Sequence, residues 1–367
     1  MSENEILAAL RLQRVPHIGD ITAKKLIAHC GSPAMVFEEK RQHLLKIEGI
    51  GQMTLRGLYD AEHFEAAETE WNFIKSNNIE VHYFVDEGYP QYLKHCIDAP
   101  ILLFARGNID LEERKIISVV GTRNSTSYGQ AFCEEFIEHI APLDPIIVSG
   151  FAYGIDIAIQ RAAVERGLQT IGCLAHGLNQ MYPRGHKKYA SEIEKNGGFI
   201  TEFWSASNPD RENFLKRNRI IAGMAEATVV VESAERGGSL VTADIAHGYN
   251  RDVFAVPGRG SDKFSVGCNN LIKQQKAHML TSAADLVYLL GWKLEKKNQK
   301  QQQTQLFVEL DDTEKSIYAF LQTNGKQLLD TVALECRLPI FKTSATLLNM
   351  EMKGIVRPLP GKLFEAI

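Results

Sequence analysis

Residues 115–129 have the sequence KIISVVGTRNSTSYG. The run Ile116–Val120 is largely apolar and β-branched, which predicts a strand covered on both faces. Gly121 lets the chain leave this strand sharply, and residues 125–127 can cap a following helix. Arg123 would then project over the helix N-terminus, where a cation and backbone N–H groups converge on one anion. The segment therefore predicts a strand–loop–helix unit with an anion-binding loop.

The same alternation of strands and helices extends outward from this unit, over about residues 101–290. Amphipathic segments of helical length, such as 128–140, 154–166 and 240–249, lie between short and largely apolar runs. This pattern predicts an α/β fold with a parallel sheet and helices on both of its faces. The predicted strands are Ile101–Phe104, Ile116–Val120, Ile146–Ser149, Thr170–Leu174, Phe199–Phe203, Thr228–Glu232 and Val253–Val256.

The N-terminal region contains a short repeat, apolar–Gly–x–apolar–Thr–x–basic–x–Leu, at residues 18–26 and again at 50–58. In each copy the glycine can turn the chain into a helix with exposed N–H groups at its start. This is typical of a helix-hairpin-helix unit that holds a nucleic-acid phosphate, although a small helical module for protein contacts is an alternative. We predict a helical, helix-hairpin-helix or SAM-like domain over 1–65 and an α/β domain over 66–290.

The C-terminal region begins with WKLEKKNQKQQQTQ, which has almost nothing to bury and predicts a flexible linker over 291–305. Residues 306–367 predict about three helices and a hairpin around Pro360-Gly361, which suggests a winged-helix-like domain. This segment has seven Lys/Arg and eight Asp/Glu. A winged helix that reads duplex DNA would normally be more positive. We therefore favour a protein-contact or regulatory role for it.

Composition narrows the class of protein. The chain has 367 residues, of which 44% are hydrophobic and 23% charged, as in ordinary globular proteins of two or three domains. It has no run of the roughly 18–20 apolar residues that span a membrane, and its acidic start does not resemble a signal peptide. We expect a cytoplasmic protein. The formal net charge is −4, so any nucleic-acid role must depend on a local basic patch.

The cysteines and histidines do not predict a metal site or a cofactor. The six cysteines, at positions 30, 96, 133, 173, 268 and 336, include no C-x-x-C pair. They fit reduced and mostly packed thiols better than disulfides. The eleven histidines include no H-E-x-x-H and no zinc-finger spacing. We therefore predict neither a metal site nor a cofactor.

Four glycine-containing loops follow predicted strands, at residues 120–129, 149–156, 175–179 and 235–240. All would lie at the carboxyl edge of the sheet, where open α/β sheets bind ligands. None is a G-x-G-x-x-G or Walker A loop, and none carries G-x-S-x-G. Any one of them could simply be a tight turn, with Ser239 capping a helix in the last. Together with Arg123, they predict an extended phosphate-binding surface.

A basic segment, residues 184–219, holds eight Lys/Arg against five acids. A solvated charged face is the plain alternative. The cluster Arg211, Lys216, Arg217 and Arg219 cannot share one helix face, so one or two of them should make internal contacts. Aromatic residues nearby favour single-stranded nucleic acid, where cations follow the backbone and rings stack on bases. The stacking candidates are Tyr128, Phe151, Tyr153, Tyr182 and Phe214, with Tyr153 and Phe214 preferred; Asp156 should stabilise the first turn of a helix.

An ordered set of short motifs runs from about residue 89 to residue 290: Tyr89-Pro90, Asp98–Pro100, Gly121–Arg123, Ser149–Asp156, Tyr182-Pro183, Asn213–Ile221, Gly238–Ala243 and Arg251–Gly258. In these motifs the sequence resembles the DprA/Smf family of DNA-processing proteins of natural transformation. Four positions depart from the family pattern: Tyr153 where a basic residue is frequent, Leu215 for a proline, Asn250 for a glycine, and Lys276-Ala277 for Gly-Ala.

The resemblance implies an extended Rossmann-like domain that binds single-stranded DNA in a positive pocket. It also implies a homodimer that protects incoming DNA and loads a RecA-type recombinase onto it, through surfaces that the motifs do not identify. The family motifs carry over DNA contacts at Arg123, 150–154, 216–218 and 237–239. With their neighbours, the predicted DNA-binding residues are Gly121, Thr122, Arg123, Ser149, Gly150, Tyr153, Gly154, Phe214, Lys216, Arg217, Asn218, Arg219, Gly237, Gly238 and Ser239.

A rival interpretation is an enzyme, because related Rossmann-like folds bind nucleotides and cleave N-glycosidic bonds. Such an enzyme would have a glycine-rich phosphate loop followed by a glutamate that acts as a general acid or base. Here Glu232 and Glu235 precede Gly237-Gly238, which is the opposite order. A purely structural adaptor would leave the basic segment unexplained. We therefore predict a binding protein without catalytic residues.

Overall fold

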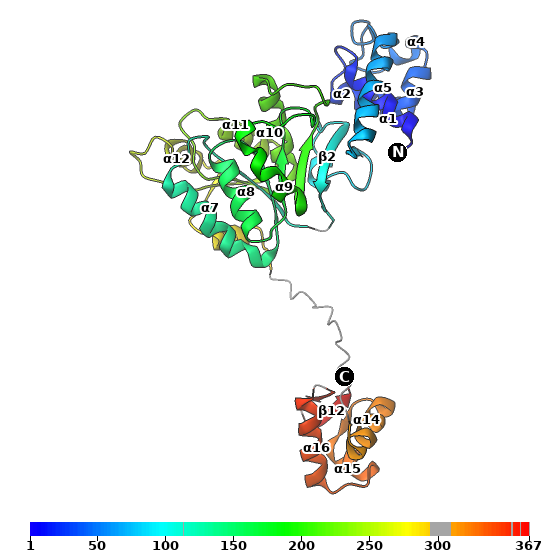
Figure 1. Cartoon of the computed structure of the whole chain (residues 1–367), viewed down its shortest axis with the longest axis vertical. Helices are drawn as coiled ribbons and strands as arrows, with labels where there is room; N and C mark the ends of the chain where they lie inside the picture. Colours follow the sequence, from blue (N-terminus) through cyan, green and yellow to red (C-terminus); the bar gives the residue numbers. More distant parts are fainter. Residues whose placement is uncertain (113, 294–309, 354, 360, 367) are drawn as a thin grey trace. The chain divides into compact units, whose positions relative to one another are not determined.

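A computed structural model describes residues 1–112, 114–293, 310–353, 355–359 and 361–366 (Figure 1). The chain divides into two compact units, residues 1–294 and 295–367, which are described here separately. Residues 294–305 of the predicted linker lie outside the described residues. None of the helices in the described ranges is both long enough and apolar enough to cross a membrane.

The first unit is built around a nine-stranded sheet with the order β1-β2-β6-β5-β4-β3-β7-β8-β9. The strands from β6 to β9 in this order are parallel, which confirms the predicted α/β fold with a large, mostly parallel sheet. The strands are β1 (Glu80–Tyr83), β2 (Leu102–Asn108), β3 (Ile116–Val120), β4 (Ile146–Ser149), β5 (Thr170–Cys173), β6 (Gly197–Thr201), β7 (Ala227–Val230), β8 (Asp252–Ala255) and β9 (His278–Met279).

One edge of the sheet departs from the prediction. The predicted strand at 101–104 is part of β2, which runs antiparallel to both β1 and β6. The segment 84–101 between β1 and β2, all of which the structure describes, contains the short helix α6 (Gln91–Lys94) and no crossover helix of a βαβ unit, so parallel pairing is not imposed there. An antiparallel edge added to a parallel sheet is common in large α/β folds.

Helices cover both faces of the sheet. Neighbouring residues of each strand point to opposite faces, so each strand contributes side chains to two separate cores. Ile116 and Val120 of β3 pack in one core with α10 and α11, whereas Ile117 and Val119 pack in another with α7 and α8. Figure 1 shows α7 and α8 side by side. The helices are α7 (Ser127–Ile140), α8 (Ile155–Glu165), α9 (Lys187–Lys195), α10 (Arg211–Met224), α11 (Gly238–Gly248), α12 (Val266–Lys273) and α13 (Ala283–Leu289), with 3₁₀ turns at Ala141–Leu143 and Arg184–His186.

The strand order reverses at β3. From β3 the chain crosses to β4 on one side, and it later returns to place β7 on the other side. A crevice opens outside the carboxyl ends of the strands at such a switch point. The loops after β3, β4 and β7 therefore meet at one edge of the sheet.

The N-terminal part is a helical bundle, α1 (Glu3–Arg14), α2 (Asp20–Cys30), α3 (Pro33–Glu38), α4 (Arg41–Leu44) and α5 (Ala61–Ser76). In the first repeat copy, Gly19 is the N-cap of α2, as predicted. The second copy was expected to begin a helix, and that prediction is wrong: residues 52–59 are turns. Gly57 has a φ of +81°, which is incompatible with a continuing α-helix.

The helical bundle and the sheet share a core. Leu10 and Leu26 of the bundle belong to the same buried cluster as Phe104 and Phe199 of the sheet. Helix α5 packs against α1 and runs through residue 65, so the predicted boundary between residues 65 and 66 would cut one continuous helix. The helical part extends to Ser76, because the first strand of the sheet follows at Glu80.

In the second unit, the described residues form three helices and a small sheet with the order β10-β12-β11. Its elements are α14 (Asp312–Asn324), β10 (Gln327–Leu328), α15 (Leu329–Glu335), α16 (Ile340–Met352), β11 (Val356–Leu359) and β12 (Leu363–Ala366). The helices and the β11–β12 hairpin close over Ile317, Leu321, Val332, Leu347 and Val356. This is the winged-helix arrangement predicted for the C-terminal region.

Candidate nucleic-acid interface

A cavity of about 770 Å³ lies at the switch point of the sheet. Three loops line it, after β3, β4 and β7, together with one face of α10 and the pair Lys263-Phe264. We call this cavity the cationic pocket, because five of its lining residues are basic: Arg123, Arg211, Arg217, Arg236 and Lys263.

The loops of the cationic pocket are held against each other by backbone hydrogen bonds. The Thr122 N–H donates to the Glu232 carbonyl at 2.7 Å, and the Ile155 N–H donates to the Thr122 carbonyl at 3.1 Å. Gly154 has a φ of +80°, and a Cβ there would lie 2.1 Å from the Thr122 carbonyl oxygen. Only glycine fits so close an approach. Gly154, predicted as a DNA contact, therefore acts by supporting the Thr122–Arg123 segment.

Helix α10 turns only part of its basic cluster toward the cationic pocket. Residues 211, 214, 215, 218 and 221 line the pocket at helical spacing. Lys216 lies on another side and lines a separate cavity beside α1, α2 and α5. Arg219 donates to the Asp98 carbonyl and pairs with Asp20 and Glu202. The predicted DNA contact at Arg219 is therefore corrected: its guanidinium makes the internal contacts expected of part of this cluster.

Arg217 is a buried cation that fixes the shape of the cationic pocket. It is only 4% exposed, and its Nη1 donates to the carbonyls of Gly150, at 2.7 Å, and of Cys173. Asp156 is buried beside it and accepts from the Gly150 N–H at 3.2 Å. Burial raises the pKa of Asp156, while the nearby Arg217 opposes that rise. The pair ties the loop after β4 to α10, which explains why Gly150 has no room for a side chain.

The other four cations are exposed and available. Arg123, Arg211, Arg236 and Lys263 are solvent-exposed, and none forms an ion pair with another described residue within 4.0 Å. Among the described residues that line the pocket, Asp156 is the one acidic residue, and its carboxylate lies beside Arg217. The cationic pocket is therefore strongly positive, although the whole chain carries a net charge of −4.

Backbone N–H groups add to the positive potential at the start of α11. Gly237 is the N-cap of this 11-residue helix, and residues 237–239 line the cationic pocket. The first N–H groups of a helix have no partner within the helix and favour an anion. Ser239, predicted as the helix cap, does not cap it: its hydroxyl donates to the Ser233 hydroxyl at 3.0 Å.

Some of the candidate aromatic residues have rings that are accessible for stacking on a base, whereas one belongs to the hydrophobic core. The Phe214 ring lines the cationic pocket, 5.1 Å from the guanidinium carbon of Arg123. Tyr153 is 50% exposed and, with Tyr182 and Phe214, lines a small adjoining hollow. Phe151 is fully buried, so the structure removes it from the stacking candidates. The preferred candidates, Tyr153 and Phe214, both have accessible rings at the rim.

The loop at residues 175–179 does not line the cationic pocket, which corrects the prediction of a four-loop surface. His176 is 1% exposed; its Nδ1 donates to the Gly177 carbonyl, and its Nε2 accepts from the Tyr182 N–H at 3.1 Å. A Cβ on Gly177 would lie 2.1 Å from the Trp204 carbonyl oxygen, so this loop is packed beneath the segment that follows β6. Ser149 is also internal, since its hydroxyl donates to the Val119 carbonyl at 2.6 Å.

Most of the predicted residues meet in one place, and three cations were missed. Arg211 lies in the predicted basic segment and Arg236 in the loop 235–240, but neither was among the predicted DNA-binding residues. Lys263 follows β8, where no strand–glycine–helix pattern marks the loop. The predicted residues that line the cationic pocket are Gly121, Thr122, Arg123, Phe214, Arg217, Asn218, Gly237, Gly238 and Ser239, while Gly150 and Tyr153 line the adjoining hollow.

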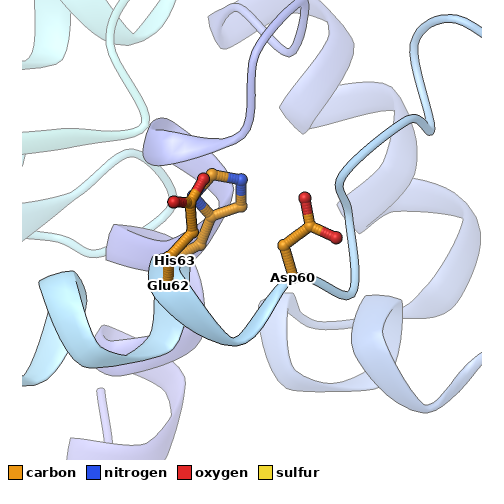
Figure 2. A group of neighbouring side chains, drawn as sticks. All are labelled: Asp60, Glu62 and His63. Carbon is orange, nitrogen blue, oxygen red and sulfur yellow. The ribbon is translucent and has the colours of Figure 1, made fainter.

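One group of side chains in the described ranges could hold a metal ion, and it lies outside the cationic pocket. Asp60, Glu62 and His63 place one ligand atom each within 4.8 Å of the others. Figure 2 shows these side chains at the start of α5, in the helical bundle. Both carboxylates are exposed and the imidazole is buried. None of the three lines the cationic pocket, so the binding chemistry there depends on cations, amides and rings.

Known proteins that are similar to this chain indicate its family. Residues 80–291 match the family model for DNA recombination-mediator protein A, and residues 301–362 match that for the DprA winged helix domain. The DNA processing protein DprA of Streptococcus pneumoniae is 38% identical over 203 residues, which are 55% of this chain and 71% of that protein. The putative DNA processing protein DprA of Mycobacterium tuberculosis is 33% identical over 269 residues, 73% of this chain and 69% of that protein.

Two solved structures are similar in fold. The X-ray structure of DprA from Streptococcus pneumoniae superposes with a TM-score of 0.65 at 29% identity, covering 78% of this chain and 98% of that chain. DNA processing protein A from Helicobacter pylori, described for its single-stranded DNA binding mode, gives 0.52 at 25% identity, covering 58% and 95%. The family models, the relatives and the solved structures all indicate one family, so the chain belongs to the DNA recombination-mediator protein A (DprA/Smf) family.

Proposed function

We propose that this protein binds single-stranded DNA in the cationic pocket, mostly through phosphates and with little sequence preference. The observation that carries the proposal is the charge of the pocket: among the described residues that line it, four exposed cations and one buried cation outnumber a single acidic residue, the buried Asp156. The Helicobacter pylori relative, described for its single-stranded DNA binding mode, supports the same ligand.

The lining residues suggest two kinds of DNA contact, one to phosphates and one to bases. Arg123, Arg211, Arg236 and Lys263 would follow the phosphates, together with the N–H groups at the start of α11. The Phe214 ring would stack on a base, which any nucleotide can provide. A base can reach that ring only when it is unstacked and unpaired, so the pocket favours single strands over duplex.

Roles beyond binding are proposed on the strength of family membership. We propose that the protein protects incoming DNA and loads a RecA-type recombinase onto it during natural transformation or other homologous recombination. We also propose that it acts as a homodimer in the cytoplasm and does not catalyse a reaction. Incubation with nucleotides, followed by product analysis, should show no turnover; release of a free base would contradict the non-enzymatic role.

The proposed ligand is tested by equilibrium binding of a labelled oligothymidylate and of a matching duplex over a series of salt concentrations. The single strand should bind more tightly, and log K should fall with log salt by about 0.7 for each phosphate contacted. Equal or tighter binding of the duplex across the series would contradict a single-strand site.

A further inference from the structure

A second hollow, of about 810 Å³, adjoins the cationic pocket across the loop that follows β8. We call it the side hollow; it is lined by residues 126–128 at the start of α7, by Glu232 and by most of the loop 257–265. Lys263 and Phe264 line both the side hollow and the cationic pocket. The two hollows therefore share the Lys263-Phe264 pair as a common wall.

The loop between the two hollows is anchored at both ends. The Ser233 N–H donates to the Phe264 carbonyl at 2.7 Å. The Asn269 side chain accepts from the Gly258 N–H at 3.2 Å and donates to the Gly258 carbonyl at 3.0 Å. Between these anchors, residues 259–263 are exposed. The wall of the side hollow is therefore fixed, while its polar side chains face solvent.

The side hollow has a stacking surface and two available cations. Tyr128 is 52% exposed, and its hydroxyl donates to the Pro257 carbonyl at 3.1 Å, which holds the ring in place. Arg259 and Lys263 are exposed, and neither forms an ion pair with the described residues. A fixed, half-exposed ring beside cations is the arrangement that sequence-independent single-strand binders use for successive bases.

The carboxylates of the side hollow make it less positive than the cationic pocket. Glu232 is 3% exposed, and its oxygens accept from the Thr126 N–H at 3.0 Å and the Thr126 hydroxyl at 2.5 Å. It therefore secures the start of α7 and is not free to act on a ligand. Asp262 is exposed. With two cations and two carboxylates, the side hollow suits a base better than a run of phosphates.

We propose that the side hollow takes a further nucleotide of the bound strand, with its base stacked on Tyr128 and its backbone passing over Lys263 and Arg259. The strand would thus turn around the Lys263-Phe264 wall from the cationic pocket into the side hollow. This proposal rests on the proposed function, and it extends the site to a ring and a cation that line only the side hollow.

The test compares a short and a long oligothymidylate, both fluorescein-labelled, of about 3 and about 12 nucleotides. The short one fits within the cationic pocket, and only the long one can also fill the side hollow. Tyr128→Ala should weaken binding of the long oligomer about 5- to 100-fold and leave binding of the short one within about twofold. Tyr128→Phe, which keeps the ring and loses only the bond to Pro257, should keep most of the wild-type affinity for the long oligomer.

Three outcomes decide between the proposals. Unchanged binding of the long oligomer by Tyr128→Ala would overturn the side hollow as a subsite. Equal losses for the two lengths would also overturn it, because the ring would then serve the cationic pocket. If the wild-type chain bound neither oligomer, or if Arg123→Ala weakened neither, the proposed function itself would fail, and that result is visible independently of Tyr128. Thermal unfolding of each variant checks that it is folded.

Discussion

Arg123→Ala removes one exposed cation from the cationic pocket with little expected effect on folding. The guanidinium is exposed and makes no ion pair with the described residues, so its charge is available to a phosphate, and it lies 5.1 Å from the Phe214 ring centroid. A hydrogen bond to a charged group contributes about 1.5–3 kcal/mol, and solvent exposure places Arg123 at the lower end. We therefore expect about a tenfold loss of affinity for oligothymidylate.

The salt dependence should change together with the affinity. One phosphate contact fewer lowers the steepness of log K against log salt by about 0.7. The loss should be similar for all base sequences, because a phosphate contact carries no sequence information. Fluorescence anisotropy with labelled homopolymers over a salt series measures both quantities. Arg123→Lys, which keeps the charge without the planar guanidinium, should recover most of the slope.

Arg161→Ala is the matched control. Arg161 lies on α8, its side chain is 53% exposed, and it does not line the cationic pocket. Its removal changes the net charge of the chain by the same amount as Arg123→Ala. If the two variants lost affinity and salt dependence equally, the effect would come from the overall field and the reasoning about a local contact would be refuted.

Three further changes test individual parts of the structure. Phe214→Ala should cost about 1–3 kcal/mol of binding free energy while leaving the salt slope unchanged; a shallower slope would give the ring the wrong role. Gly154→Ala should lower the urea midpoint and weaken DNA binding, because the new Cβ would lie 2.1 Å from the Thr122 carbonyl oxygen; a wild-type midpoint would contradict this. Burial lowers the pKa of His176, so the unfolded chain binds a proton below about pH 6.5 that the native chain does not. His176 should therefore contribute a loss of up to about 1.4 kcal/mol of unfolding free energy per pH unit on acidification below that pH, and His176→Gln should lose correspondingly less than the wild type; equal losses would contradict it.

The sheet was largely predictable, because parallel strands that are buried on both faces have continuous apolar sequences. Ile116–Val120 and Ile146–Ser149 are such runs, and the structure has strands with these bounds. The strand at Glu80–Tyr83 was not predicted, since an antiparallel edge strand with exposed and polar residues has no continuous apolar signal. The second copy of the repeat matched the first in pattern, but the positive φ of Gly57 decides its conformation, and a residue pattern does not reveal that angle.

The cationic pocket was predictable where a strand, a glycine and a helix follow each other. That pattern located the loops with Arg123 and Gly237. It could not separate Arg217 from Arg219, because the direction of each side chain depends on how α10 packs against the sheet and the helical bundle. It missed Lys263 because the loop after β8 reaches the pocket only through tertiary contacts, such as the bond from the Ser233 N–H to the Phe264 carbonyl.

Mapping where the strand touches the protein tests the central claim most directly. Oligothymidylate substituted with 5-iododeoxyuridine would be photo-crosslinked to the full chain, and the modified peptides identified by mass spectrometry. We predict crosslinks in the peptide that carries Phe214, lost when unlabelled oligothymidylate competes. Crosslinks confined to residues 1–76 or 310–366, with none around the cationic pocket, would contradict the account.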